Sequence, residues 1–501
     1  MKRPLLAALV VSTLIAGCAQ KPKPTVEPQR PVAPKRGVKA LKADLASYYG
    51  APAFQNAVWG VLVRSLATGE TLYSLNPGTF LMPASNMKVV TMAAAAERLG
   101  WAFTFTTTVV ATGPVEAGVL KGDLVVIGGG DPSLGGRPTE GPSIVERWAD
   151  QIRAKGITRI EGRIVGCDNV FDDEGLGQGW AWDYLAYDYA TPVSGLDFNE
   201  NVVRLSFTPG SAAGDPVAVT ARPDGGGLTI EAAVTTAAAD GTADVHVVRH
   251  PGSRTLGVTG SVPAGKTDVT QPVSVENPTE FMVSAFRHAL LGRGIEVAGG
   301  AIDADALPAP PDVTGAETLV SHTSPPLSEI GKVLLKASQN LYADTLLKAI
   351  GRPAEGGPAT TRDGRRVLRE VLQGWGVAPE QYLQADGSGL SRYNYLTANV
   401  LVTVLTRMYA DDRHYEPFIT ALPVAGVDGT IASRMKDTKA QGNARAKTGS
   451  IANARALSGY VTSADGEPLV FSMIVNSFNV PQAQADAIID RAVIRLAEFR
   501  R

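Results

Sequence analysis

Residues 102–310 differ in composition from the chain on either side of them, and this contrast constrains the fold most strongly. The stretch is rich in Val, Thr and Gly. Its alternation of apolar and polar residues predicts short β-strands joined by frequent turns. Two helices are expected within it, over residues 143–156 and 278–294, because each of these apolar patterns ends at a glycine that suits a helix C-terminus.

The flanking segments predict a different secondary structure, with more helix. Residues 38–101 predict an amphipathic start, then two strands separated by the turn sequence Ala67-Thr68-Gly69-Glu70, then a helix that ends at Gly100. Residues 313–409 predict mainly helices. The last stretch, residues 445–501, predicts two strands and a terminal helix from about Gln482.

With 501 residues, the chain is long enough for roughly three domains. We expect an α/β (α+β) fold in which residues 39–101 and 313–501 form one domain from both ends of the chain. Residues 102–312 form an inserted region, expected to consist of two mainly β subdomains.

The N-terminus has the pattern of an export signal. Lys2 and Arg3 precede an apolar run over residues 5–15, which is too short to span a bilayer as a helix. The run ends in Leu14-Ile15-Ala16-Gly17-Cys18, which resembles the lipobox of bacterial lipoproteins. That resemblance implies a signal peptide over residues 1–17 and acylation of Cys18. A soluble secreted protein cut near Ala19 is the alternative.

Residues 18–38 are expected to be a lipid anchor and an extended tether, because proline is frequent and no apolar periodicity is present. Several acyl chains on Cys18 would anchor the protein stably to a membrane. We expect an exported protein at the periplasmic face of the envelope. Outer-membrane placement is expected because Ala19, rather than Asp, follows the cysteine. No later run of eighteen apolar residues predicts a membrane span.

Charge, cysteine content and glycine pattern limit the possible partners. The formal net charge is −2 and no stretch is strongly basic, which argues against a nucleic acid partner. Residues 128–130 are three glycines without the following Lys-Ser/Thr of a phosphate loop, so we expect a tight turn and no cofactor. With Cys18 lipidated, Cys167 has no disulfide partner and is either a buried small hydrophobe or a thiol that lines a site.

A first short motif, Pro83-Ala84-Ser85-Asn86-Met87-Lys88, lies where a turn gives way to a helix. Residues three apart share a helix face, so Lys88 can bring its amine to the Ser85 hydroxyl. A lysine kept neutral by its surroundings can take the proton of such a serine and activate it as a nucleophile. The motif alone is weak, because Ser85 could simply be a helix N-cap.

Two further motifs are weaker still by themselves. Ser338-Gln339-Asn340 lies between two predicted helices, where such residues commonly make a turn. Lys447-Thr448-Gly449 precedes Ser450 in a predicted strand, on which Lys447 and Gly449 face the same way. A glycine at residue 449 would let a substrate backbone come close.

The order of the three motifs, Ser-x-x-Lys, Ser-x-Asn and Lys-Thr-Gly, resembles that of the penicillin-recognising serine enzymes. Lys88 and Ser338 are 250 positions apart. This gap is similar to that of the class C low-molecular-mass penicillin-binding proteins, the D-Ala-D-Ala carboxypeptidase/endopeptidase family S13. Further segments similar to that family are Gly122-Asp123-Leu124, Gly129-Gly130-Asp131-Pro132, Ala190-Thr191-Pro192-Val193-Ser194, Asn199-Glu200-Asn201, Asp386-Gly387-Ser388-Gly389-Leu390-Ser391-Arg392 and Leu457-Ser458-Gly459-Tyr460.

Two positions depart from the family's usual pattern. Cys167 stands where an acidic residue is common, so a different substrate preference is expected if that position touches the substrate side chain. Gln339 stands where Asp or Asn is common, and its side chain is not expected to take part in the chemistry.

The resemblance implies a mechanism. Ser85 would attack a peptide bond after D-Ala in peptidoglycan stem peptides, and Lys88 would take its proton. Ser338 would relay a proton to the leaving amine, and Asn340 would orient the substrate and Lys88. The remaining implied roles belong to the third motif, where Lys447, Thr448, Gly449 and Ser450 form the substrate-binding strand. Lys447 and Thr448 would hold the terminal carboxylate, and the backbone N–H groups of Ser85 and Ser450 would form the oxyanion hole. β-Lactams would acylate the same serine.

No metal is expected. His246 and His250 are four residues apart, which suits a metal on a helix, but their surroundings predict a strand, where that spacing is about 13 Å.

Three alternative functions are compatible with the same residues. A β-lactamase would need fast deacylation, and no added base is evident in the sequence. A non-catalytic wall-binding lipoprotein is disfavoured because all three motifs are intact. No glycosyltransferase-like region supports a wall-building transpeptidase. The sequence does not separate carboxypeptidase from endopeptidase activity, and it does not predict the oligomeric state.

Overall fold

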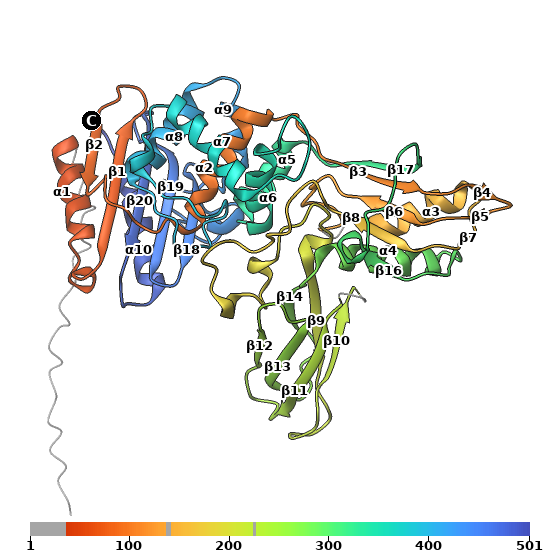
Figure 1. Ribbon diagram of the computed structural model, residues 1–501. Helices are drawn as coiled ribbons and strands as arrows, with labels where there is room; N and C mark the ends of the chain where they lie inside the picture. Colours follow the sequence, from red (N-terminus) through yellow and green to blue (C-terminus); the bar gives the residue numbers. More distant parts are fainter. Residues whose placement is uncertain (1–36, 137–141, 224–226) are drawn as a thin grey trace, which may run out of the picture. The chain divides into compact units, whose positions relative to one another are not determined.

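The computed structural model describes residues 37–136, 142–223 and 227–501 (Figure 1). The chain divides into two compact units, residues 1–35 and residues 36–501, and only the second lies within the described part. The expected signal peptide, Cys18 and most of the tether therefore lie outside the described residues. Within the described ranges, no helix combines the length and the hydropathy needed to cross a bilayer.

A five-stranded antiparallel sheet with the order β18-β19-β20-β1-β2 joins the two ends of the chain. Alternate residues face opposite sides, because side chains in a strand alternate. On β1, Val61 and Val63 contact one core cluster and Leu62 contacts another. The strands are β1 (Val58–Ser65), β2 (Thr71–Leu75), β18 (Arg445–Ile451), β19 (Ala454–Thr462) and β20 (Pro468–Asn476).

Helices cover both faces of this sheet. On one face, α1 (Val38–Tyr49) and α10 (Gln482–Ala497) pack their apolar sides against the strands. The other face carries a helical layer whose central member, α2 (Met87–Leu99), is buried over most of its length. The rest of that layer is α5 (Leu327–Lys336), α6 (Asn340–Ile350), α7 (Thr361–Gly374), α8 (Ala398–Ala410) and α9 (Tyr415–Ala421).

The inserted region contains a mixed sheet with the order β16-β8-β6-β3-β17 and two helices packed on it (Figure 1). A smaller sheet has the order β15-β7-β5-β4. The elements are β3 (Thr106–Ala111), β4 (Val115–Glu116), β5 (Val119–Leu120), β6 (Leu124–Ile127), α3 (Ile144–Ala154), β7 (Arg159–Ile160), β8 (Ile164–Cys167), α4 (Pro278–Gly292), β15 (Glu296–Val297), β16 (Ala301–Asp303) and β17 (Glu317–Thr323).

Two three-stranded sheets, β10-β9-β14 and β11-β13-β12, complete the inserted region. Their apolar faces share one core cluster with α3 and α4, so both halves of the insertion have a common core. The strands are β9 (Val202–Thr208), β10 (Ala218–Arg222), β11 (Thr229–Ala237), β12 (Asp244–Arg249), β13 (Thr255–Pro263) and β14 (Val269–Ser274).

The α/β fold class and the helices expected at α2, α3, α4 and α10 are confirmed. Two features of the insertion differ from the expectation. Strand β17 lies after residue 312, yet it pairs with β3 and so continues the inserted region's sheet. The half that carries α3 and α4 is mixed α/β instead of mainly β, because both helices pack on its sheet.

Candidate active site

The three motifs meet at one cleft of about 390 Å³. Ser85 lies in a single 3₁₀ turn, η2 (Ala84–Asn86), that leads directly into α2. Ser338 and Asn340 lie at the junction of α5 and α6, and Thr448 and Ser450 lie on β18. The cleft is lined by Ser85, Tyr184, Tyr189, Ser338, Asn340, Gly389, Leu390, Thr430, Thr448, Ser450, Ile451, Ala452 and Gln482.

The Lys88 amine has three neighbours and is fully buried. Its Nζ atom lies 2.9 Å from Ser85 Oγ, 2.5 Å from Asn340 Oδ1 and 2.7 Å from the Ser388 carbonyl oxygen. The amide and peptide oxygens can only accept hydrogen bonds. A neutral amine therefore donates its two N–H groups to them and keeps its lone pair for the Ser85 hydroxyl.

The electrostatic surroundings of Lys88 favour this neutral form. Burial lowers the pKa of Lys88 to about 8, while the negative charges of Asp344 and Asp386 oppose that shift. Burial disfavours the charged form of any amine, because the protein interior solvates an ion less well than water does. The amine is therefore close to half neutral at mildly alkaline pH.

Asn340 is held from two sides. Its Oδ1 atom accepts from Lys88, and its Nδ2 group donates to the Tyr189 carbonyl oxygen at 2.7 Å. This pair of contacts fixes the orientation of the amide, because its oxygen can only accept and its nitrogen can only donate. Tyr189 belongs to the inserted region, so that region helps to position the second motif.

Lys447 is a second buried amine beside the cleft. Its Nζ donates to Ser338 Oγ at 2.8 Å and to the Thr448 carbonyl oxygen at 2.8 Å. Burial, and then the nearby Lys88 charge, hold the pKa of Lys447 well below its ordinary value. Both hydroxyl-bearing side chains, Ser338 and Thr448, line the cleft beside it.

Backbone strain collects around these residues. Ala84 and Ser338 have φ values of 46° and 60°, which are uncommon for residues other than glycine. Such strain persists only where the surrounding contacts hold it, and it is frequent at functional sites.

The glycine of the third motif, Gly449, packs closely against the segment that carries Ser85. A Cβ on Gly449 would lie 2.3 Å from the Pro83 carbonyl oxygen and 3.0 Å from Asn86 Nδ2. Asn86 also donates to the Lys447 carbonyl oxygen at 3.0 Å. β18 therefore approaches the segment that carries Ser85 closely at Gly449.

Two carboxylates for which no role was predicted, Asp344 and Asp386, shape the site. Asp344 Oδ1 accepts from the backbone N–H groups of Gly387 and Ser388 at 2.6 and 3.0 Å. Asp386 accepts from Gly389 and Ser391 at 2.7 and 2.6 Å. These bonds fix the loop so that the Ser388 carbonyl oxygen reaches Lys88. Asp344 follows Asn340 by four residues on α6, and this helical spacing is the signal that could have identified it.

The side chain of Gln339 also has a contact that was not expected. Its Nε2 donates to Glu200 Oε2 at 2.6 Å, and Tyr342 Oη donates to Glu200 Oε1 at 3.2 Å. Glu200 belongs to a segment already noted in the sequence, Asn199-Glu200-Asn201. Its role was missed because a contact between residues 139 positions apart leaves no local pattern.

Cys167 is not among the described residues that line the Ser85 cleft. It ends β8 in the inserted region and is partly buried as a free thiol. Burial raises its pKa, and the neighbouring Asp168, Asp305 and Asp303 charges act in the same direction.

Two clusters of ligand-type side chains occur among the described residues, and neither adjoins the cleft. In the first, His414 lies 2.9 Å from Glu97 and accepts from the Trp101 indole at 3.1 Å, so both ring nitrogens are engaged. The second contains Asp168, Asp303 and Asp305. His246, for which a metal was considered, lies on β12, a strand as expected, and pairs with Asp244.

Comparison with known proteins places this geometry in a family. The model of the D-Ala-D-Ala carboxypeptidase 3 (S13) family matches residues 41–498. The D-alanyl-D-alanine carboxypeptidase of Actinomadura sp. (strain R39) is 37% identical over 473 residues, which cover 92% of this chain and 85% of that protein.

Solved structures agree with the sequence comparison. The crystal structure of penicillin binding protein 4 (dacB) from Haemophilus influenzae is similar, with a TM-score of 0.79 and 26% identity over 91% of this chain and 99% of that one. The same Haemophilus influenzae protein complexed with a β-lactam gives a TM-score of 0.73 and 25% identity, with the same coverage of both chains.

Proposed function

The chain belongs to the D-Ala-D-Ala carboxypeptidase 3 (S13) family and is a serine hydrolase, and we propose that it cleaves peptidoglycan stem peptides through an acyl-enzyme on Ser85. The three contacts of Lys88 Nζ carry the proposal, because they aim a lone pair at the Ser85 hydroxyl and leave no other partner for it. Lys88 is therefore the base that activates the nucleophile.

The reaction then follows from the positions of the side chains. Ser85 Oγ attacks the carbonyl carbon of the bond after D-Ala, and its proton passes to Lys88. As the C–N bond breaks, the proton that Lys88 received passes through Ser338 to the leaving amine; Ser338 Oγ lies 2.8 Å from Lys447 Nζ. Water then hydrolyses the ester: its oxygen bonds to the acyl carbon as the bond to Ser85 Oγ breaks, and one of its protons restores the Ser85 hydroxyl. Carboxypeptidase and endopeptidase cleavage use the same steps, because both break a bond after D-Ala.

Substrate binding is assigned to β18. This strand is at the edge of its sheet, so an extended peptide can pair along it. The substrate's terminal carboxylate would be held by Lys447 and by the Thr448 hydroxyl. Gly449 keeps the strand close to Ser85, and the backbone N–H groups of Ser85 and Ser450 would bind the oxyanion.

The central test is covalent labelling of the protein without its first 36 residues. Brief exposure to benzylpenicillin should give a lasting adduct, because β-lactams resemble the peptide and deacylate slowly. Intact mass and peptide mapping should place it on Ser85. The variant Ser85→Ala should give none, while Ser47→Ala on the exposed side of α1 should label normally.

Other outcomes of this experiment identify the alternatives. Rapid loss of benzylpenicillin without a lasting adduct would mean a β-lactamase. No adduct and no loss would favour a non-catalytic wall-binding role. Full peptidase activity in Ser85→Ala would contradict the assigned nucleophile.

We also propose that Cys18 carries a lipid that holds the enzyme on the periplasmic face of the envelope, at the outer membrane. The support is the sequence Leu14-Ile15-Ala16-Gly17-Cys18 and the proline-rich stretch that follows. The variant Cys18→Ser, expressed at full length, should move from the membrane fraction to the soluble fraction. An unchanged distribution would overturn the anchor.

A further inference from the structure

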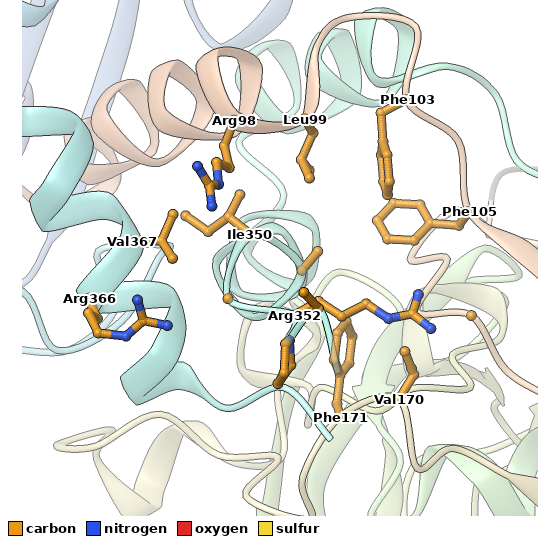
Figure 2. A pocket seen from close by; sticks show the side chains of 15 residues that line it. Arg98, Leu99, Phe103, Phe105, Val170, Phe171, Ile350, Arg352, Arg366 and Val367 are labelled. Atoms are coloured by element: carbon orange, nitrogen blue, oxygen red, sulfur yellow. The ribbon is translucent and has the colours of Figure 1, made fainter. Parts of the chain in front are cut away.

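A second pocket lies at the far ends of the two helices that carry the catalytic residues (Figure 2). Helix α2 begins beside Lys88 and ends at Leu99, and helix α6 begins at Asn340 and ends at Ile350. The last residues of both helices line this pocket, and the inserted region supplies Phe171. None of the described residues that line it also lines the Ser85 cleft.

The floor of this pocket is apolar. Phe105, Phe171 and Ile350 are each at most 4% exposed, although they border a space of about 320 Å³. Leu99, Phe103 and Val170 are half-buried around them. Small-molecule sites in proteins are typically concave, largely apolar and of about this size or larger, roughly 300–1,000 Å³.

The rim of the pocket is cationic. Figure 2 shows Arg98, Arg352 and Arg366 around the apolar side chains, and all three are exposed to solvent. Arg366 pairs with Glu370 at 3.0 Å. Neither Arg98 nor Arg352 makes an ion pair with any described carboxylate, and no Asp or Glu is among the described residues that line the pocket.

Helix dipoles account for only part of this arrangement. Arg98 lies in the last turn of α2 and Arg352 follows the end of α6, where a cation is favourable by a few tenths of a kcal/mol, about 0.3–1. Arginines on a flat surface would interact with the helix dipoles equally well, so the dipoles do not explain a pocket lined by buried phenylalanines. Arg366 is within α7, where its ion pair with Glu370 accounts for it.

We propose that this pocket is a binding site for a small amphiphilic anion, namely a carboxylate carried on an apolar group. The apolar group would enter between Phe105, Phe171 and Ile350, where its removal from water is favourable. The carboxylate would remain at the rim on the side of Phe105 and meet the guanidinium group of Arg352, while Arg98 adds positive charge from the other side of Ile350 (Figure 2). Guanidinium groups match carboxylates in two-point geometry. The proposal is independent of the reaction at Ser85.

The test is calorimetric titration of the protein without its first 36 residues, after benzylpenicillin has acylated Ser85. Acylation keeps the active site from interfering with the measurement. Octanoate should bind saturably, and octanamide, the neutral molecule of the same shape, should bind at least about fivefold more weakly. This ratio corresponds to roughly 1 kcal/mol from the charge at an exposed rim.

Variants show where the probe binds. The double variant Arg98→Gln/Arg352→Gln should weaken octanoate binding at least about fivefold and leave octanamide binding unchanged. Ala354→Trp, which adds bulk to the pocket lining while keeping both arginines, should weaken the binding of both ligands. Arg362→Gln, on the same helix as Arg366 but outside the pocket, is the matched control and should change neither. All variants should still acylate with benzylpenicillin at the normal rate.

The natural source of the carboxylate is decided by a second titration. Octanoate represents a fatty acyl chain, and acetyl-D-alanyl-D-alanine represents the end of a wall peptide. If the double variant loses saturable binding of octanoate, the source is a fatty acyl chain. If it loses saturable binding of acetyl-D-alanyl-D-alanine, the source is a wall peptide. The proposal is overturned if neither binds saturably, if octanamide matches octanoate, or if the double variant retains full affinity.

Discussion

The ionisation of the Lys88 amine should determine how the activity of the enzyme varies with pH. Its amine must be neutral to accept the Ser85 proton, and its pKa is lowered to about 8 by burial. Below that pH the neutral fraction falls tenfold for each pH unit. We expect kcat/KM for a D-Ala-D-Ala peptide to rise with pH, to reach half of its plateau near pH 8 and to level off above that pH, because kcat/KM reports the pKa values of the free enzyme. A profile that is flat from pH 6 to 8 would contradict Lys88 as the base.

The charge of Asp344 should set the position of that rise. Its carboxylate raises the pKa of Lys88, so Asp344→Asn should move the rising limb of kcat/KM to lower pH. The Asn side chain keeps an oxygen that can accept from Gly387 and Ser388, which preserves the loop. Glu355→Gln, an exposed change outside the site, is the control and should leave the profile unchanged. A shift to higher pH would show that the assigned electrostatic effect has the wrong sign.

At the scale of elements, the contact between β18 and the turn that holds Ser85 is tight. A Cβ on Gly449 would lie 2.3 Å from the Pro83 carbonyl oxygen, which is closer than real contacts allow. We expect Gly449→Ala to push the strand outward and to destabilise the protein by about 1–3 kcal/mol. Urea unfolding measures the stability, and benzylpenicillin labelling should slow in parallel.

A second glycine provides the comparison for that experiment. Gly374 is the last residue of α7, and a Cβ there would meet nothing within 4 Å. Gly374→Ala should therefore be neutral or slightly stabilising, since alanine is the better helix former. If both variants unfold alike, the close approach at Gly449 is not what makes glycine necessary there.

Local sequence patterns predicted individual helices and strands well, but they did not predict contacts between distant segments. The helix from Met87 to Leu99 was predictable because Gly100 ends its apolar pattern. Strand β17 was not predictable as part of the inserted region, because its partner β3 is about 200 positions earlier in the chain. Pairing over such distances depends on tertiary packing, which a short sequence window does not contain.

The same distinction applies to the active site. The spacing of Ser85 and Lys88 predicted their contact, and in the structure Ser85 Oγ and Lys88 Nζ lie 2.9 Å apart. The sequence motifs also named Asn340 and Lys447 as members of the site, and their roles stay predictions. The Tyr189 carbonyl oxygen could not be predicted, because a backbone group contributes through its position and carries no residue-type signal.

For the whole molecule, the inserted region takes part in the active site instead of only separating the two ends of the chain. Tyr189 supplies a carbonyl oxygen to Asn340, and Glu200 accepts from Gln339 and Tyr342. These contacts hold the junction of α5 and α6, where Ser338 has a strained backbone. Losing a hydrogen bond to a charged group costs about 1.5–3 kcal/mol.

We therefore expect Glu200→Ala to reduce kcat/KM by about tenfold or more while the protein stays folded. Glu200 does not itself line the cleft, so its loss should act through the junction of α5 and α6 that it holds. The expected result is slower acylation of Ser85. Glu231→Ala, which removes an exposed carboxylate on strand β11, is the control for general damage to the insertion. Stopped-flow measurement of benzylpenicillin acylation separates the two cases. An equal loss in both variants would mean that the inserted region supports only stability, whereas a loss confined to Glu200→Ala places part of the catalytic alignment in the insertion.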